Sequence, residues 1–335
     1  MIAVDLFSIR DSLTYCDKKL LEKINMKPGG LLDCTHNELP NVKTDKEANG
    51  GACANSVKTM AMLTQIFKRG DWCAMYTAVS NDFSGRLYED SLNRYGILPV
   101  LVKKINATAK ILCLITKKPD NRAFIVCTPP KESFLKTDEI SKNIFNQTRC
   151  VFLDGYCIGR SPEFLPFLTK LVKHKNNDVV FNCGHYTIVK KHRDLILDQI
   201  KQGNIDYLFM NHEEARELMP GISDLNACKE LSNYCKRVII THDKYGYYIG
   251  NGGKSRHYSL IPLDDVEDPT GAGDSFEGAF LWGHFQGLND EKAGKFAHSI
   301  ALEFLQVIGT DITEEQKEYI RINWEKSLPR GRSCR

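Results

Sequence analysis

The sequence predicts an α/β protein built on a mostly parallel β-sheet that is covered by helices on both faces. Short apolar runs rich in β-branched and aromatic residues recur along the chain, and segments with the helical period of about 3.6 residues lie between many of them. Such alternation is typical of parallel sheets, because each connection between parallel strands crosses a face of the sheet. With 335 residues, the chain can bury a substantial core in one large domain or in a large domain with a small one.

The predicted elements follow in chain order. Strands are expected at residues 72–79, 110–116, 122–127, 150–153, 178–182, 207–210, 238–241 and 247–249, and helices at residues 55–67, 161–173, 190–202, 212–218 and 224–235. Asn182, Asn211 and Thr241 each stand at the end of a predicted strand. Because ligands of open parallel sheets collect at the carboxyl ends of the strands, we expect polar site residues there.

Two segments depart from this alternation. Residues 11–49 are polar and irregular around a short amphipathic stretch at residues 18–24, and residues 101–128 contain two strands joined by a turn. We expect these segments to form a small lid together. The chain has no low-complexity linker and no internal repeat, so the lid is expected to be inserted in a single domain that spans residues 1–335.

The composition argues against several classes of partner. A formal net charge of +3 gives no electrostatic signature of nucleic-acid or anionic-membrane binding. No uncharged apolar run approaches the roughly 20 residues of a membrane span. The 12 cysteines are scattered, with no C-x-x-C motif and no preceding signal peptide, which predicts reduced thiols and a cytoplasmic location. A small-molecule partner fits these properties.

The most informative motif is residues 268–274 (DPTGAGD), which lead into an apolar helical run at residues 275–282. Gly271 and Gly273 allow a tight turn without a side chain above the backbone amides, and a helix N-terminus adds about half a positive charge. A polyphosphate can dock at such a turn. Because Asp274 would be repelled by a resting phosphate, we expect it to face the attacking hydroxyl group and to accept its proton. Taken alone, the motif is also typical of an ordinary helix start, with Asp274 as the N-cap.

Three motifs that occur in order resemble the ribokinase-like (PfkB) family of sugar and nucleoside kinases: Gly50-Gly51, Asn211-x-x-Glu214 and residues 271–274 (GAGD). Within this family, the chain is most similar to adenosine kinases in residues 11–28 (DSLTYCDKKLLEKINMKP), 50–56 (GGACANS) and 120–122 (DNR). The resemblance implies a three-layer α/β/α ribokinase-like core. It also implies a small β-rich lid that closes over the acceptor and excludes water.

The resemblance implies a nucleoside as the acceptor. The family holds the ribose with an aspartate, a glycine pair and an asparagine, and the matching positions are Asp11, Gly50, Gly51 and Asn55. A carboxylate can accept hydrogen bonds from two vicinal hydroxyl groups, paired glycines let the backbone approach the sugar, and an amide both donates and accepts. Tyr156 falls where an aromatic ring stacks on the acceptor base. The glycine pair also fits a plain loop, and Tyr156 also fits a buried core tyrosine.

The resemblance also implies ATP with Mg²⁺ as the donor. Asn211 and Glu214 begin a helix and are expected to organise Mg²⁺ beside the phosphates, with Glu214 holding it through water. A helix cap with acidic residues in the first turn explains the same pattern. Thr241 occupies the strand-end position near the donor nucleotide. Asp268 with Thr270 is expected to place a monovalent cation, K⁺.

Two further parts of the chain are expected to stabilise the negative charge that develops in the transition state. The backbone at Gly271, Ala272 and Gly273 would receive the transferred phosphoryl group. Arg122, in the predicted lid, resembles a residue that swings onto the phosphates and offsets this charge. A turn arginine in solvent is the alternative for Arg122.

Three positions depart from the pattern of the family. Leu6-Phe7 stands where adenosine kinases have a Gly-Asn pair, which removes one polar contact to the nucleoside. The donor-side pattern Thr-x-Gly is Thr241-His242-Asp243 here, which puts a carboxylate near a polyphosphate site and is expected to disfavour ATP or to alter the donor preference. Pro269 replaces a usual hydroxyl residue and removes one N–H group.

The expected function is ATP-dependent phosphorylation of the 5′-hydroxyl group of a purine nucleoside, with adenosine converted to AMP in purine salvage. Two alternatives stay open. The first is a sibling kinase that acts on another nucleoside or on a sugar, and Leu6-Phe7 argues for it. The second is a nucleoside-binding protein that has lost catalysis, for which Asp243 and Pro269 argue.

Overall fold

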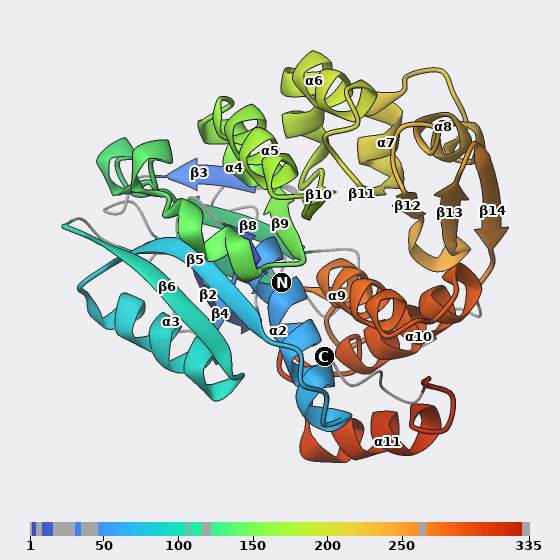
Figure 1. The fold of residues 1–335 in the computed structure, drawn as a ribbon. Coiled ribbons are helices and arrows are strands. Elements are labelled where there is room, and N and C mark those ends of the chain that lie inside the picture. The colour runs from blue at the N-terminus through green and yellow to red at the C-terminus, as the bar shows by residue number, and fades with distance from the viewer. Residues whose placement is uncertain are drawn as a thin grey trace. The chain divides into compact units, whose positions relative to one another are not determined.

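The computed structural model describes residues 2–4, 9–15, 31–34, 46–105, 108–115, 122–260 and 266–329, and Figure 1 labels their helices and strands. The chain forms two compact units, each made of two stretches of sequence. The first unit is Met1–Asp5 with Lys136–Leu263, and the second unit is Leu6–Leu135 with Asp264–Arg335. The predicted amphipathic stretch at residues 18–24 and the departure at Leu6-Phe7 lie outside the described residues.

A largely parallel sheet forms the centre of the first unit. Its strands follow the order β14-β13-β12-β11-β10-β9-β1. Strands β1, β9, β10, β11 and β12 are parallel to one another, and β13 and β14 add an antiparallel hairpin. This confirms the predicted fold class. The strands are β1 (Ile2–Val4), β9 (Cys150–Asp154), β10 (Asp178–Asn182), β11 (Tyr207–Asn211), β12 (Arg237–Thr241), β13 (Tyr247–Asn251) and β14 (Lys254–Tyr258).

Helices connect these strands and cover them. They are α4 (Gly155–Arg160), α5 (Phe164–His174), α6 (Tyr186–Lys201), α7 (His212–Leu218) and α8 (Asp224–Leu231), with short 3-10 turns η2 (Thr137–Glu139), η3 (Lys142–Gln147) and η4 (Asp243–Tyr245). Val151, Phe181, Leu208 and Ile239 lie in neighbouring strands and are fully buried. A sheet covered on both faces needs apolar residues at successive positions, which is why these strands are visible in the sequence as continuous apolar runs.

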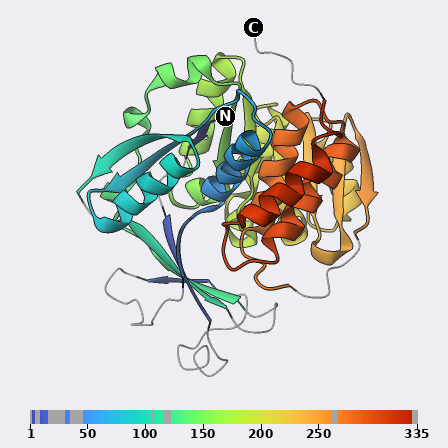
Figure 2. The same ribbon diagram turned by 90° about the horizontal axis from the view of Figure 1, so that it is seen from below.

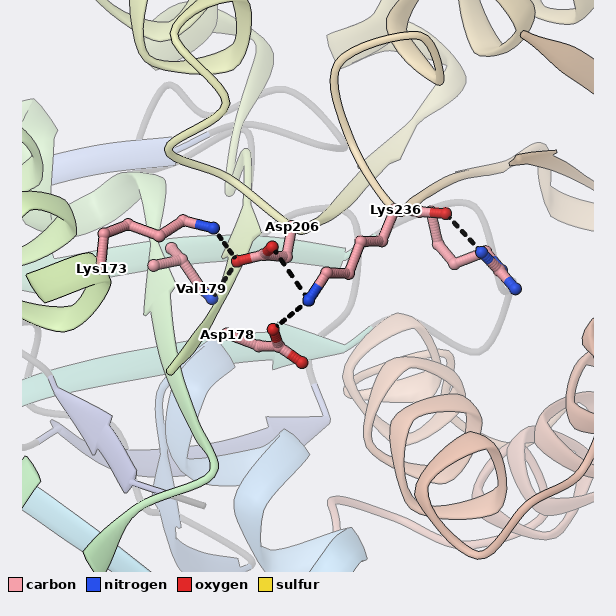
Figure 3. Close-up of polar contacts among 6 residues, drawn as sticks. Lys173, Asp178, Val179, Asp206 and Lys236 are labelled. Carbon is pink, nitrogen blue, oxygen red and sulfur yellow. Dashed lines mark hydrogen bonds and ion pairs between the residues drawn. The ribbon is translucent and has the colours of Figure 1, made fainter. Parts of the chain in front are cut away.

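A buried carboxylate ties together the amino ends of the parallel strands (Figure 3). Asp206, which directly precedes β11, accepts hydrogen bonds from the Val179 amide at 2.8 Å and from Lys173 Nζ at 2.5 Å. Its second oxygen lies 3.3 Å from Lys236 Nζ, which also pairs with Asp178. Burial lowers the pKa of Lys236, but the Asp178 and Asp206 carboxylates outweigh burial and raise it. The network lies at the strand ends opposite to Asn182, Asn211 and Thr241, so it belongs to the scaffold.

The second unit contains a five-stranded sheet with the order β3-β8-β7-β2-β4. Its strands are β2 (Ile9–Tyr15), β3 (Leu31–Cys34), β4 (Lys46–Gly50), β7 (Ala109–Ile115) and β8 (Arg122–Cys127). The irregular structure predicted for residues 11–49 is therefore wrong at residues 11–15, 31–34 and 46–49, which are the described part of this segment. β2 and β3 pair in parallel with β7 and β8, which are distant in sequence, so no local hairpin pattern reveals them. That this sheet acts as a lid within a single domain stays a prediction.

The remaining elements of the second unit are a parallel strand pair and a group of helices. They are β5 (Cys73–Ser80) with β6 (Ile97–Lys104), the helices α2 (Ala52–Ile66), α3 (Phe83–Arg94), α9 (Ala272–Phe285), α10 (Asp290–Phe304) and α11 (Glu314–Trp324), and the 3-10 turn η1 (Lys131–Ser133). None of the helices in the described part of the chain is both long enough and apolar enough to span a membrane.

Helices α2 and α9 lie side by side and approach each other closely (Figures 1 and 2). A Cβ atom on Gly278 of α9 would lie 2.3 Å from the Ser56 carbonyl oxygen of α2, so only glycine fits at this crossing. Farther along, the Trp282 ring packs 5.2 Å from Phe67 and 5.6 Å from Phe296 of α10, measured between ring centroids. This packing fixes α2 against the middle and the C-terminal part of α9.

Candidate active site

The predicted phosphate-binding motif forms the turn that starts α9. Gly271 is the N-cap residue, with a left-handed conformation at φ 76° and ψ 2°. A Cβ atom there would lie 2.5 Å from Thr310 Cγ2, so conformation and space both require glycine. A Cβ atom on Gly273 would meet nothing within 4 Å. The helical hydrogen bonds begin with the Ser275 N–H and the Gly271 oxygen at 2.8 Å, so the preceding amides lie outside the α9 ladder.

Asp268 fastens this turn to the loop that follows α10. Its side chain is fully buried, and its two carboxylate oxygens accept hydrogen bonds from the Thr270 amide at 2.9 Å and the Gly309 amide at 2.8 Å. The structure therefore gives Asp268 an anchoring role. Among the described residues, the buried Thr270 hydroxyl has no hydrogen-bond partner. The expectation that these two residues place K⁺ stays a prediction.

Asp274 and Asn55, predicted as base and ribose ligand, are in direct contact. Asn55 Nδ2 donates a hydrogen bond to Asp274 Oδ2 at 2.9 Å, and Asp274 is partly exposed. Asn55 is only 6% exposed, and its Oδ1 atom accepts no hydrogen bond from the described residues. An amide that orients a carboxylate with its N–H group and keeps its oxygen available can accept a hydrogen bond from a hydroxyl group. The pair is thus suited to a polar acceptor.

The glycine pair forms the junction between β4 and α2. Gly50 is the last residue of β4 and lies opposite Ile9 of β2. Gly51 is the N-cap of α2 with φ 99°, and its oxygen accepts the Asn55 amide at 2.9 Å. The two glycines are therefore not a plain loop. Their geometry sets the direction in which α2 carries Asn55.

Two predicted site residues are described only through their backbone. Asp11 lies in β2, opposite Ala48 of β4 and Ile111 of β7. Arg122 is the first residue of β8. Their side chains lie outside the described structure, as do Asp120 and Asn121 of the predicted lid turn. The proposed contacts of Asp11 with the acceptor and of Arg122 with the phosphates stay predictions.

In the first unit, polar residues collect at the carboxyl ends of the strands as predicted. Asn182 is the last residue of β10, and Asn211 and Thr241 end β11 and β12. Asn211 and Thr241 are direct neighbours in the register of the two strands. This edge of the sheet therefore presents amide and hydroxyl groups side by side.

Asn211 and Glu214 form a complete capping box at the start of α7. Asn211 Oδ1 accepts the Glu214 amide at 2.9 Å, and the Glu214 carboxylate accepts the Asn211 amide at 2.9 Å and Asn211 Nδ2 at 3.0 Å. Glu214 is only 3% exposed. The described residues contain no group of three or more His, Cys, Asp or Glu side chains that could hold a metal ion. That Glu214 organises Mg²⁺ through water stays a prediction.

Asp243 stands where the Thr-x-Gly pattern has a glycine, and its backbone conformation is one that favours glycine. Asp243 has a positive φ of 43°, which favours glycine, and its side chain is 76% exposed. Its Oδ2 atom lies 3.7 Å from His212 Nδ1. The His212 ring stacks on His242 at 4.3 Å, and His242 Nδ1 lies 3.0 Å from Asp224 Oδ2. The His212 side chain therefore lies next to the Asp243 carboxylate, which the sequence predicts to lie near the donor site.

Tyr156 lies in the first turn of α4 and is partly exposed. A Cβ atom on Gly184 would lie 3.3 Å from its ring, so the glycine makes room for the aromatic face. Tyr156 is thus not a buried core tyrosine. Stacking on an acceptor base stays a prediction for this residue.

Two residues beside the Gly271 turn were not predicted from the sequence. Thr310 packs against Gly271 from the loop after α10, and Lys58 of α2 donates a hydrogen bond to Thr310 Oγ1 at 2.8 Å. Thr310 belongs to no motif. Lys58 leaves a weak signal, because it is a charged residue within the otherwise apolar and small residues of a helix that is buried from Cys53 to Leu63.

Comparisons with known proteins identify the family of the chain. Residues 24–317 match the pfkB family carbohydrate kinase. The ATP-dependent 6-phosphofructokinase of Thermoanaerobacterium thermosaccharolyticum is 22% identical over 318 residues, covering 91% of this chain and 94% of that protein. A nucleoside kinase of Methanothermobacter thermautotrophicus is 25% identical over 274 residues, covering 80% of this chain and 82% of the relative.

A solved structure shows the same fold. The adenosine kinase from Sinorhizobium meliloti superposes with a TM-score of 0.83 at 20% sequence identity, covering 96% of this chain and 98% of that chain. This likeness confirms the three-layer α/β/α ribokinase-like fold. The protein belongs to the pfkB family of carbohydrate kinases, and it is a phosphotransferase that acts on a hydroxyl group of a nucleoside or a sugar.

Proposed function

We propose that the protein transfers the γ-phosphoryl group of ATP to the 5′-hydroxyl group of a purine nucleoside, and that adenosine is the preferred acceptor. The observation that carries the proposal is the start of α9, where the partly exposed Asp274 is oriented by Asn55 next to the open backbone at Gly273. The adenosine kinase with the same fold and the nucleoside kinase relative support a nucleoside as the acceptor class.

In this proposal Asp274 is the general base. The nucleoside O5′ atom forms a bond to the γ-phosphorus, the bond from this phosphorus to the β–γ bridging oxygen breaks, and ADP leaves with the electron pair. The hydroxyl proton passes to the Asp274 carboxylate. Since phosphoryl transfer has a loose transition state, orientation and charge stabilisation contribute most of the rate acceleration. The Asn55 contact holds the carboxylate in one orientation during this step.

The remaining residues bind the substrates. The backbone of Gly271, Ala272 and Gly273 receives the transferred group, and Thr241 contacts the donor. Kinases of this kind use ATP with Mg²⁺, which neutralises phosphate charge when bound. Glu214 would hold this ion through water, and Asn211 fixes Glu214 by the capping box. The residues that would bind the acceptor are Asp11, Gly50, Gly51, Asn55 and Tyr156. Arg122 would offset the negative charge of the transition state. Asp268 and Thr270 would place K⁺.

A sugar kinase is the second candidate, because the 6-phosphofructokinase relative matches nearly the whole chain. The experiment that separates the two is a coupled assay of ADP release with adenosine, inosine, guanosine, cytidine, ribose, fructose and fructose 6-phosphate. We expect the highest kcat/KM with adenosine. Dominant activity on a sugar would overturn the nucleoside proposal. Calorimetric binding of a nucleoside without ADP release from any acceptor would instead indicate a binding protein that has lost catalysis.

A further inference from the structure

A buried lysine contacts the loop that packs against the Gly271 turn. Lys58 lies in α2 and is only 3% exposed. Its Nζ atom donates a hydrogen bond to Thr310 Oγ1 at 2.8 Å. The methyl group of Thr310 occupies the space that a side chain on Gly271 would need, with Cγ2 only 2.5 Å from an ideal Cβ position. One buried side chain therefore connects the Lys58 ammonium to the turn.

Lys58 and Asn55 act on the same short turn from the same helix. Residues three apart in a helix share one face, and Asn55 holds Asp274 while Lys58 holds Thr310 against Gly271. The two contacts support both ends of the turn at residues 271–274. They also make the position of this turn depend on α2.

An acidic and an aromatic side chain also lie near the Lys58 ammonium. Asp311 Oδ1 lies 4.0 Å from Lys58 Nζ, and the same oxygen accepts a hydrogen bond from the Tyr95 hydroxyl group. The Tyr95 ring centroid lies 5.7 Å from Nζ. Burial and the Asp311 carboxylate raise the pKa of Tyr95, so at neutral pH its hydroxyl group keeps its proton. A buried ammonium costs free energy that an apolar side chain of the same length would avoid, which argues for a role beyond packing.

We propose that Lys58 is a positioning residue for phosphoryl transfer, whose ammonium holds Thr310 against Gly271 and supplies a fixed positive charge near the amides that receive the phosphoryl group. A charge in a buried, weakly screened environment acts over several ångströms, so it can stabilise negative charge that it does not touch. The inference rests on the proposed role of residues 271–274.

The test uses the full-length enzyme and two pairs of variants. Lys58→Met keeps most of the stem and removes the charge, and it should lower kcat by about 10- to 100-fold while changing the KM of the acceptor less than about twofold. Lys58→Ala should show the same loss and regain activity several-fold when methylammonium is added. Thr310→Val keeps the shape and loses the hydroxyl group, so it should behave as Lys58→Met does, whereas Thr310→Ser should keep nearly normal turnover.

The outcomes separate this inference from the proposed function. Wild-type kcat in Lys58→Met would overturn the inference and leave the proposed function intact. A loss in Lys58→Met without rescue of Lys58→Ala by methylammonium, together with normal turnover of Thr310→Val, would reduce Lys58 to a packing role and also overturn it. If the Lys58 variants do not fold, the Thr310 pair decides by the same criterion. Absence of kinase activity in the wild-type enzyme marks failure of the proposed function itself.

Discussion

Helices α7 and α9 both have an acidic residue in the first turn, but the side chain is buried in one helix and partly exposed in the other. In α7 and in α9 an acid stands at the third helical residue, as Glu214 and as Asp274. The N-cap of α7 is Asn211, which closes a reciprocal box around a carboxylate that is 3% exposed. The N-cap of α9 is Gly271, which offers no side chain to the helix amides. Asp274 is instead held from another helix, by Asn55, and stays partly exposed.

This difference shows that the N-cap residue determines whether the acidic side chain is held by local capping hydrogen bonds or by another helix. The Asn211 cap accepts the Glu214 amide and donates hydrogen bonds to the Glu214 carboxylate, and these local contacts stabilise the helix. A left-handed glycine cap supplies no side-chain acceptor to the amides of the first turn, of which the Ala272 amide meets the Pro269 oxygen at 3.4 Å, and the acid is then oriented by tertiary structure. The same two ingredients therefore give a structural cap in α7 and a candidate reaction site in α9.

Among substitutions at the two helix starts, Asp274→Asn is expected to have the largest effect on turnover. Removing the proton acceptor should lower kcat by roughly two to four orders of magnitude and leave nucleoside binding largely in place. Turnover by ADP release and nucleoside affinity by calorimetry measure the two parts. Glu314→Gln is the matched control, because Glu314 is an exposed acid in the first turn of α11 and should change neither quantity. Normal turnover in Asp274→Asn would remove Asp274 as the base.

A second comparison uses the two glycines of the α9 turn. Gly271→Ala forces a left-handed alanine against Thr310 and should cost about 1–3 kcal/mol of unfolding free energy as well as activity. Gly273→Ala enters open space in the first helical turn, so its stability should be unchanged or higher by up to about 1 kcal/mol. Urea unfolding gives both values. Equal stability of the two variants would contradict the strained, tightly packed conformation assigned to Gly271.

At the start of α7, two substitutions of Glu214 separate capping from metal binding. Glu214→Ala loses the box and should lower the unfolding free energy by about 0.5–2 kcal/mol. Glu214→Gln can still accept the Asn211 amide with its oxygen but turns its NH2 group toward Asn211 Nδ2, so its loss of stability should be smaller than that of Glu214→Ala without being zero. Its Mg²⁺ concentration for half-maximal activity should rise by about tenfold, because the charge that would hold the hydrated ion is gone. An unchanged Mg²⁺ requirement in Glu214→Gln would leave Glu214 with the capping role alone.

The smallest expected effect concerns a third helix start, which is capped by a charged residue. Asp82 caps α3 and accepts hydrogen bonds from the Gly85 amide at 2.7 Å and the Thr108 amide at 2.9 Å. Burial raises the pKa of Asp82, but these hydrogen bonds outweigh burial and lower it below the ordinary value of 3.8. The ionised carboxylate therefore adds stability above about pH 4, and this stability is lost as the pH falls through the folded-state pKa.

Asp82→Asn keeps a capping side chain without the charge and tests this sign. Its loss of unfolding free energy should stay within about 1 kcal/mol at pH 7 and shrink as the pH is lowered from 4 to 3. Urea unfolding at several pH values measures it. A difference that grows toward low pH would contradict the assigned direction.

Local patterns in the sequence predicted the central strands and the α9 motif, because both depend on residues that are close along the chain. β10 and α7 begin and end at the predicted residues, since each has an apolar pattern bounded by polar residues. α3, α10 and α11 were not predicted as helices. β2, β3 and β4 were missed because their pairing partners are set by the tertiary structure rather than by a local turn.

The same limit applies to the site. Gly271 and Asp274 were recognised from their motif, and the contact of Asp274 with Asn55 joins two motifs that are 219 residues apart. Gly278 and Thr310 could not be recognised, because their importance comes from the close approach of Ser56 and of Gly271 in the folded protein. Motif residues that meet a ligand are visible in a sequence, whereas residues that position them are visible only through packing.

The most direct test of the roles proposed for Asp274 and the adjacent amides is a crystal structure of the protein with adenosine and a non-hydrolysable ATP analogue. We predict that the 5′-hydroxyl group of the nucleoside lies within about 3.2 Å of the Asp274 carboxylate, or one water away, with the terminal phosphate against the amides of residues 271–274. A nucleoside bound elsewhere, or a phosphate that makes no contact with these amides, would contradict it.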